Sequence, residues 1–432
     1  MDVVIVGAGF AGVVAARELT TRGYGTVILE GRDRIGGRTL TRGWNGFLAE
    51  LGGQWIHWTQ PHVWAEVTRY GLPIHERAPV ESAWWISQGR VHAGSVEDLH
   101  RVYADAWSEL LAGAASVFPR PYEPLAARRE LDALDGITVG QRLDRMKLEP
   151  EARDVVRALA SVGFNAPCDD GALTQLMRRV ALVGCHPDLL AQALATFKLT
   201  DGTRGLLDAI LADADAAVEL STRVTRIDAT GDGVTVHAGA RRYRARAAIV
   251  TAPISTLGDI EFLPELSAGK RAMVTAGQMT RGAMLWLRLR NVPAQFLLMA
   301  PPEHRLTYVR SDAQLGDEII ANAFAPVAAR VDMQDKRQLE RDVRAWLPRA
   351  DLVDVLVHDW TTDPFSQQTW TMLRPRQLSE SFSALREPEG AVVFAGADYA
   401  SGWLGFIDGA IESALAAARR VDALLAAPAV QA

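Results

Sequence analysis

Three glycines near the start of the chain constrain its fold more than any other feature. They follow Val3-Val-Ile-Val6, a β-branched run that indicates a buried parallel strand, and they open a segment with helical spacing. In this context Gly7 permits a tight turn, Gly9 lets the backbone approach a pyrophosphate, and Gly12 lets the helix pack on the strand. The helix N-terminus favours the phosphate charge. The pattern predicts a dinucleotide-binding βαβ unit.

An acidic residue ends the second strand of this unit. Thr26-Val-Ile-Leu29 indicates a second buried strand, and Glu30 follows Gly12 by eighteen positions. A carboxylate there can accept hydrogen bonds from ribose hydroxyls and would repel a 2′-phosphate, so NADP is disfavoured. Glycines alone could merely shape a turn, but strand, helix and acid together favour a nucleotide. These features leave FAD and NAD both open.

Length, charge and cysteine spacing limit the remaining possibilities. The chain has 432 residues, 48% of them hydrophobic, which indicates two closely packed domains. A net charge of -6 leaves no basic surplus for nucleic acid. No apolar stretch approaches the ~20 residues that cross a bilayer, and the first strand directly follows Met1, without room for a secretory signal. Cys168 and Cys185 lack metal-ligand spacing. We expect a cytoplasmic protein without metal, membrane or nucleic-acid partners.

Strand-rich and helical segments alternate along the rest of the chain. Residues 96–197 have helical spacing and indicate a helical insertion, whereas strand signals return over 217–251 and 283–360. A turn is expected at Gly231-Asp232-Gly233. A last strand at 391–394 precedes a helix that begins near Phe406. Because no linker separates these segments, the domains are expected to interleave.

Further motifs distinguish FAD from NAD. Arg32 and Gly36-Gly37-Arg38 precede Glu50-Leu-Gly52-Gly53-Gln54-Trp55, and Phe394-Ala-Gly396-Ala-Asp398 precedes Gly402-Trp403-Leu-Gly405-Phe406. This arrangement resembles the flavin-dependent amine oxidase family, which includes monoamine oxidases and bacterial 6-hydroxynicotine oxidases, over nearly the whole chain. The resemblance implies FAD as the cofactor.

The resemblance also implies roles for single residues. The arginine matching Arg38 contacts the FAD phosphates as a second cationic clamp, the backbone at Val224 holds the adenine, and the acid matching Asp398 meets the ribitol chain. The helix beginning near Phe406 aims its N-terminus at the flavin. The expected FAD-binding residues are Gly7, Gly9, Gly12, Glu30, Arg32, Gly37, Arg38, Gly52, Gly53, Gln54, Trp55, Val224, Asp398, Trp403, Phe406 and Ile407.

The predicted fold class is α/β, with a Rossmann-like FAD-binding domain interleaved with an α+β substrate domain. The FAD-binding domain is expected to be discontinuous and to comprise residues 1–78, 199–275 and 386–432. The substrate domain comprises residues 79–198 and 276–385 and is expected to contain a mixed sheet and the helical insertion.

Two aromatic residues match the substrate slot of the family. An isolated tryptophan or phenylalanine more often packs in a core, but Trp370 and Phe406 stand where relatives place two rings that orient the amine. Phe406 replaces a common tyrosine. Thr369 stands where monoamine oxidases carry the cysteine that attaches FAD, which predicts a non-covalent flavin.

The strand at 282–288 resembles the one that carries the family's lysine beside flavin N5, where it assists the reaction with oxygen. This strand has no lysine: the best register puts Met284 at that position, with Leu285 as the alternative. A thioether is neither a cation nor a strong hydrogen-bond donor. The sequence therefore predicts slow reoxidation by oxygen.

The resemblance therefore implies an FAD enzyme that oxidises the C–N bond of an apolar or aromatic amine by hydride transfer, giving an imine that hydrolyses. The expected catalytic residues are Trp370, Phe406 and Met284. Expected partners are the amine and either oxygen, which would be reduced to hydrogen peroxide, or an electron carrier; a homodimer is left open. A dehydrogenase or desaturase, an amino-acid oxidase and a non-catalytic flavin protein remain alternatives.

Overall fold

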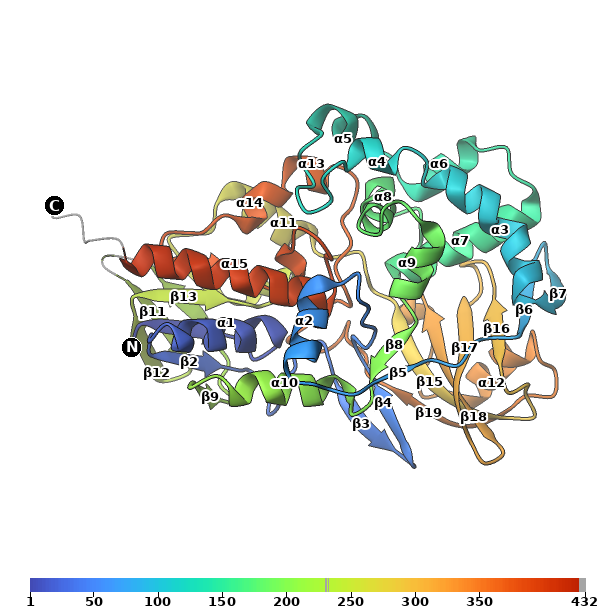
Figure 1. Ribbon diagram of the computed structural model, residues 1–432, viewed down its shortest axis with the longest axis horizontal. Helices are drawn as coiled ribbons and strands as arrows, with labels where there is room; N and C mark the ends of the chain where they lie inside the picture. The colour runs from blue at the N-terminus through green and yellow to red at the C-terminus, as the bar shows by residue number, and fades with distance from the viewer. Residues whose placement is uncertain (230, 232, 427–432) are drawn as a thin grey trace.

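Two large β-sheets organise the chain. The computed structural model describes residues 1–229, 231 and 233–426. A five-stranded sheet lies at the left of Figure 1 and a seven-stranded sheet at the right, with a group of helices above the latter. We call the first sheet with its helices the parallel-sheet half, and the second with its helices the mixed-sheet half.

The parallel-sheet half is assembled from distant parts of the chain. Its strands run in the order β20-β13-β1-β2-β9, and each neighbouring pair is parallel. Their bounds are β1 (Val3–Val6), β2 (Thr26–Leu29), β9 (Ala217–Glu219), β13 (Ala247–Val250) and β20 (Val392–Phe394). Three helices pack together on this sheet: α1 (Phe10–Thr21), α10 (Gly202–Ala212) and α15 (Ile407–Ala426). Burial on both faces explains why β1 is a continuous apolar run.

Smaller elements extend this half. A four-stranded sheet contains β10 (Arg226–Asp228), β11 (Val234–Ala238), β12 (Arg241–Ala245) and β14 (Glu261–Leu263). Further elements are β3 (Thr41–Trp44), β4 (Phe47–Glu50), α2 (Pro61–Arg69), β5 (Ile74–Glu76), β8 (Phe197–Leu199), α11 (Ala268–Ala276), α13 (Gln377–Glu380) and α14 (Phe382–Arg386). The β3–β4 hairpin reaches toward the mixed-sheet half, because Trp44 and Leu51 join a core cluster with Trp286.

The seven-stranded sheet has the order β19-β15-β18-β17-β16-β6-β7. Its strands are β6 (Ser82–Ser87), β7 (Arg90–Ser95), β15 (Ala283–Arg290), β16 (Phe296–Met299), β17 (Tyr308–Leu315), β18 (Glu318–Ala325) and β19 (Asp351–Val357). Only β16 and β6 pair in parallel among these neighbours. Helix α12 (Lys336–Arg344) covers one face, where Leu339 and Val343 pack with Leu285 and Leu287.

The helical group occupies the top of Figure 1. Its members are α3 (Val96–Leu110), α4 (Ala114–Val117), α5 (Arg128–Leu134), α6 (Val139–Arg145), α7 (Pro150–Phe164), α8 (Leu173–Ala181) and α9 (Pro187–Ala193). Helix α7 packs on α3 and β6, which ties the group to the mixed sheet. All nine residues of α8 are buried, so this helix lies inside the group.

The predicted fold class is confirmed, with errors in single elements. Within the strand-rich ranges 217–251 and 283–360, residues 223–225 and 358–360 lie outside the strands, whereas the last helix begins at Ile407, close to the expected Phe406. The hairpins β3–β4 and β6–β7 were not predicted, because glycine and arginine interrupt the apolar pattern of β3 and β7. The turn expected at 231–233 includes residue 232, which lies outside the described residues. The domain boundaries remain a prediction.

Candidate flavin and substrate site

The turn between β1 and α1 offers a cradle for an anionic group. Gly7 has φ +103°, a conformation that side chains rarely adopt. A Cβ at Gly12 would overlap the carbonyl oxygen of Gly7, whereas a Cβ at Gly9 would meet nothing closer than Gly37 Cα at 3.8 Å. No side chain caps α1, and within the described residues the amide of Phe10 has no partner. Free amides and open space at Gly9 fit a phosphate.

Glu30 lies beside this turn. Its carboxylate accepts hydrogen bonds from the amides of Ala8 (2.7 Å) and Arg32 (2.8 Å), and the residue is 3% exposed. Each oxygen keeps a second lone pair for a ribose hydroxyl. Nearby, the backbone amide and carbonyl of Val224 have no partner among the described residues. These groups fit the nucleoside end of a dinucleotide.

Arg32 is engaged with protein groups. Its guanidinium donates to Asp363 Oδ1 at 2.6 Å and to Ser366 Oγ at 2.8 Å. Burial raises the pKa of Asp363, but the hydrogen bond from His358 and the charge of Arg32 outweigh it and hold that pKa well below its usual range. The guanidinium of Arg32 therefore positions the loop at 363–366, and direct contact of this group with FAD stays a prediction.

Arg38 and Asp398, expected to meet different parts of FAD, form an ion pair at 2.6 Å. Arg38 also donates to the carbonyl of Thr369 at 2.9 Å, and Asp398 accepts from the amide of Ile254 and from Gln368 Nε2. A guanidinium has five N–H donors, so Arg38 keeps donors for a phosphate. The pair joins the cofactor motifs to the segment that carries Trp370.

The paired glycines meet the start of α15. A Cβ at Gly52 would overlap the carbonyl oxygen of Arg38, and a Cβ at Gly53 would lie 3.5 Å from Ile407 Cγ1. The amides of Ile407 and Asp408 have no partner among the described residues. The indole of Trp403 donates to the carbonyl of Thr59 at 2.9 Å. Gly52 and Gly53 thus leave backbone without side chains beside the N-terminus of α15. The positive end of the helix dipole there would stabilise negative charge on the edge of a flavin ring.

The structure separates the two registers considered for the missing lysine. Leu285 lies in the core beneath α12, whereas Met284 and Trp286 point toward the β3–β4 hairpin. Gln54 Nε2 donates to Met284 Sδ at 3.5 Å, and Gln54 Oε1 is buried without a partner among the described residues. Met284 therefore faces the segment 52–55, and Leu285 points away from it.

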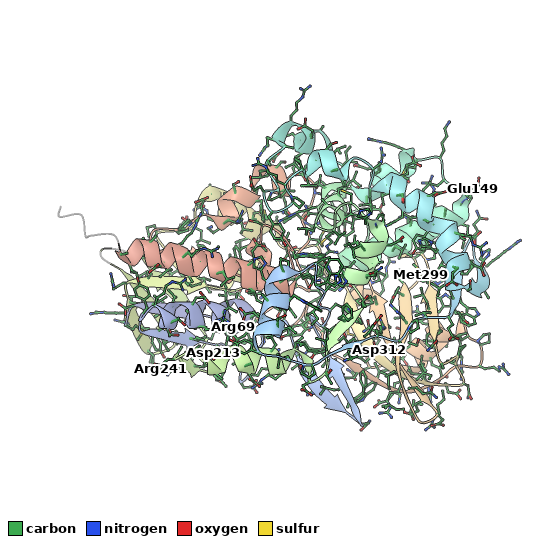
Figure 2. The ribbon with its side chains drawn as sticks, in the orientation of Figure 1. Arg69, Glu149, Asp213, Arg241, Met299 and Asp312 are labelled. Atoms are coloured by element: carbon green, nitrogen blue, oxygen red, sulfur yellow. The ribbon has the colours of Figure 1, made fainter. Side chains whose placement is uncertain are left out.

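A buried lysine that the sequence reasoning missed lies next to this strand. Lys198 Nζ contacts both oxygens of Asp312 at 2.7 and 2.8 Å and lies 4.9 Å from the ring centre of Trp286. Asp312, labelled in Figure 2, also pairs with Arg77 at 2.9 Å. Lys198 Nζ and Arg77 also lie over the ring of Trp55. Burial lowers the pKa of Lys198 to about 8 against the opposing charge of Asp312.

Lys270, the lysine nearest to the strand in sequence, points elsewhere. Its ammonium donates to the carbonyls of Ala384, Leu385 and Glu387 around α14. Lys270 is therefore held at α14 rather than beside the strand. The only sequence signal for Lys198 was the scarcity of lysine in the chain.

Trp370 and Phe406 are carried by two segments in direct contact. Gly405 has φ +84°, and a Cβ there would lie 2.9 Å from the backbone of Thr371 and 3.2 Å from Trp370 Cβ. Trp370 Nε1 donates to the carbonyl of Gly163 at 3.1 Å. Both rings are half-buried. The two aromatic residues expected to orient the amine thus come from neighbouring segments.

A buried arginine joins this pair. Arg179 Nη1 donates to the same Gly163 carbonyl at 2.7 Å, and its guanidinium carbon lies 5.1 Å from the ring centre of Phe406. Sequence reasoning missed Arg179, because nothing in a single sequence distinguishes a buried arginine from the many exposed ones.

Metal and membrane features are absent from the part of the chain that the structure describes. Across residues 1–229, 231 and 233–426, no group of three or more His, Cys, Asp or Glu side chains could hold a metal ion. No helix in these ranges is long and apolar enough to cross a membrane.

Comparison with known proteins gives a consistent result. A family model described as flavin containing amine oxidoreductase matches residues 10–422. Pseudooxynicotine dehydrogenase of Pseudomonas sp is 35% identical over 419 residues, covering 95% of this chain and 84% of that protein. Nicotine dehydrogenase of Pseudomonas putida is 33% identical, covering 98% and 89%. (S)-6-hydroxynicotine oxidase of Paenarthrobacter nicotinovorans is 27% identical, covering 96% and 97%.

Solved structures share the fold. A redesigned triple mutant of putrescine oxidase superposes with a TM-score of 0.84 at 22% identity, covering 98% of both chains. Cyclohexylamine oxidase from Brevibacterium oxydans gives a TM-score of 0.80 at 23% identity, covering 98% of this chain and 99% of that one.

Proposed function

The chain belongs to the flavin-containing amine oxidoreductase family, whose members oxidise amines with a flavin, and from this premise we propose that it holds FAD without a covalent bond and reacts slowly with oxygen. The observation that carries the second part is Met284, which faces Gln54 where the resemblance places a lysine. The proposed substrate is an apolar or aromatic amine. The proposed location of the protein in the cell is the cytoplasm.

Thr369 supports non-covalent binding. It occupies the position of the attaching cysteine, and its hydroxyl donates to the carbonyl of Thr280 at 3.2 Å. A hydroxyl so placed is a poor nucleophile toward a flavin methyl group. The affinity for FAD would then come from the Gly9 cradle, Glu30, Arg38 and the amides at the start of α15.

The reaction needs orientation more than acid–base chemistry. When bound, FAD would accept a hydride from the carbon beside the amine nitrogen. Trp370 and Phe406 would hold the amine between their rings, and restricting its approach in this way contributes much of the rate. The oxidised product is an imine, which water hydrolyses to a carbonyl compound and a free amine or ammonia.

The residues around Met284 favour an electron carrier over oxygen. A thioether supplies neither a charge nor a strong donor to a partly reduced oxygen species. Lys198, the buried cation beside the same strand, is held in an ion pair with Asp312, which Arg77 shares. Two relatives are named as dehydrogenases, for pseudooxynicotine and for nicotine. Their names support an aromatic amine and a dehydrogenase here, whereas the third relative, an oxidase, keeps the oxidase as the second candidate.

Two measurements test this proposal. Acid precipitation of the purified protein should leave a yellow supernatant in which mass spectrometry identifies FAD, and colour that stays on the denatured chain would contradict non-covalent binding. Anaerobic mixing with a panel of aromatic amines should bleach the flavin absorbance. If no aromatic amine in the panel reduces the flavin, the proposed substrate class is wrong.

A further inference from the structure

Helix α8 carries two adjacent buried arginines with different surroundings. Arg178 Nη2 donates to the carbonyls of Ala400 and Ser401, and its guanidinium lies over the ring of Phe382. Arg178 Nε and Nη1 are also buried without a hydrogen-bond partner among the described residues. The contacts of Arg178 are with these carbonyls and Phe382 rather than with Trp370 or Phe406, so Arg178 has a structural role. Arg179 is 7% exposed, and within the described residues its Nη2 is buried without a hydrogen-bond partner. One end of this guanidinium is therefore unsatisfied.

Arg179 lies over the ring of Phe406 and shares a hydrogen-bond acceptor with Trp370. Its Nη1 shares the Gly163 carbonyl with Trp370 Nε1, at 2.7 Å and 3.1 Å. Its guanidinium carbon lies 5.1 Å from the ring centre of Phe406. The guanidinium that carries the unsatisfied donor therefore binds the carbonyl that also accepts from Trp370, and it contacts the ring of Phe406.

Arg179 also forms no ion pair with a carboxylate among the described residues. Burial, and after it the charge of Arg178, lower the pKa of Arg179 to about 9, so the side chain still carries its charge at neutral pH. The ring of Phe406 stabilises a cation only partly. A buried charge and a buried N–H both require a partner, and an oxygen acceptor would supply it.

We propose that Arg179 donates from Nη2 to an oxygen acceptor of the substrate, a carboxylate or a carbonyl, beside the amine in the slot. The inference rests on the proposed function, since it assumes that Trp370 and Phe406 hold the amine. Arg179 would then select amines that carry such an oxygen over plain hydrocarbon amines. It would also disfavour a second positive charge nearby, so that the amine binds neutral or paired with its own carboxylate.

Binding without turnover tests the proposal most cleanly. Flavin-absorbance titrations of the holoenzyme with phenylacetate and phenylacetone, which lack an amine, should show saturable binding. Arg179→Gln should weaken binding of the preferred probe by at least about tenfold, the loss expected for one charge-assisted hydrogen bond. Tighter binding of phenylacetate would assign a carboxylate, and tighter binding of phenylacetone a carbonyl. Equal affinities for wild type and Arg179→Gln, or no binding of either probe, would overturn the proposal.

Two further variants keep the test sound. Arg179→Lys retains the positive charge but loses the planar guanidinium with its paired N–H donors. Compared with Arg179→Gln, it should recover part of the phenylacetate affinity and little of the phenylacetone affinity. It also serves if Arg179→Gln does not fold. The matched control is Arg178→Lys, which should lower the melting temperature and leave both affinities unchanged. A parallel loss of probe affinity in Arg178→Lys would show that Arg179 acts only through packing.

A substrate panel separates this inference from the proposed function. Phenylalanine and 2-amino-1-phenylethanone differ from 2-phenylethylamine by one carboxylate and by one carbonyl, respectively, and each keeps a C–H bond beside the amine nitrogen. Arg179 predicts faster flavin reduction by an amine bearing the oxygen, and Arg179→Gln should abolish that preference. Bleaching by 2-phenylethylamine as fast as by the other two would contradict the role of Arg179 while leaving amine oxidation intact. Probe binding without bleaching by any aromatic amine would contradict amine oxidation and leave the role of Arg179 standing.

Discussion

The cofactor cradle and the substrate slot are built from different kinds of chemical group. The cradle in the parallel-sheet half consists of backbone, at Gly7, Gly9 and Gly12, within six consecutive residues. The substrate slot consists of side chains and one carbonyl, from segments around 163, 179, 370 and 406. The comparison teaches that a cofactor held by backbone leaves a contiguous motif, whereas a slot made of side chains leaves scattered residues.

The largest expected effect separates glycines that serve the fold from glycines that serve the cofactor. Gly12→Ala should prevent stable folding, because the new Cβ overlaps the carbonyl oxygen of Gly7. Gly9→Ala should fold, because its Cβ meets nothing closer than 3.8 Å, yet should lose FAD. Circular dichroism and the ratio of flavin to protein absorbance distinguish the two. A yellow Gly9→Ala protein with full FAD content would refute the cradle.

The ion cluster at the boundary between the halves provides the second test. Asp312→Asn leaves Lys198 and Arg77 buried without an anion, which should cost about 3 kcal/mol of unfolding free energy. Burial raises the pKa of Asp312, but Lys198 and Arg77 lower it overall. Its contribution is thus present above pH ~4 and is lost as the pH falls further.

Chemical denaturation of wild type and Asp312→Asn at pH 7 and pH 3 measures this contribution. The difference between the two proteins should shrink at the lower pH. An equal difference at both pH values would mean that the carboxylate is not the stabilising group.

The third test addresses the substrate slot alone. Trp370→Ala should slow flavin reduction by an amine about a hundredfold, because the substrate loses one wall of its slot. FAD content should stay near that of wild type, since the cradle lies in other segments. Anaerobic stopped-flow reduction measures the rate. Equal losses of FAD and of rate would mean that Trp370 supports the flavin rather than the substrate.

The smallest expected effect comes from Phe406→Tyr. The change keeps the ring and adds a hydroxyl, so the reduction rate should change by less than about threefold, or substrate preference should shift. Steady-state assays with two aromatic amines suffice. A loss as large as that of Trp370→Ala would show that the position tolerates no polar atom.

Different parts of the molecule were predictable to different extents. The strands beside Gly7 and Glu30 were placed correctly, because burial on both faces leaves continuous apolar runs. The choice between Met284 and Leu285 required the structure, because both residues are apolar and only their alternation across β15 separates them. Arg179 was not predictable, since its burial depends on the packing of α8 among neighbouring helices.

The reaction of the reduced enzyme with oxygen tests the central claim most directly. The enzyme is reduced anaerobically with one equivalent of an amine that bleaches it, then mixed with aerated buffer in a stopped-flow instrument. With Met284 facing Gln54 and Lys198 paired with Asp312, we expect flavin absorbance to return more slowly than the amine reduced it. An artificial electron carrier should restore the absorbance faster than oxygen does. Reoxidation by oxygen faster than reduction by the amine would contradict the account.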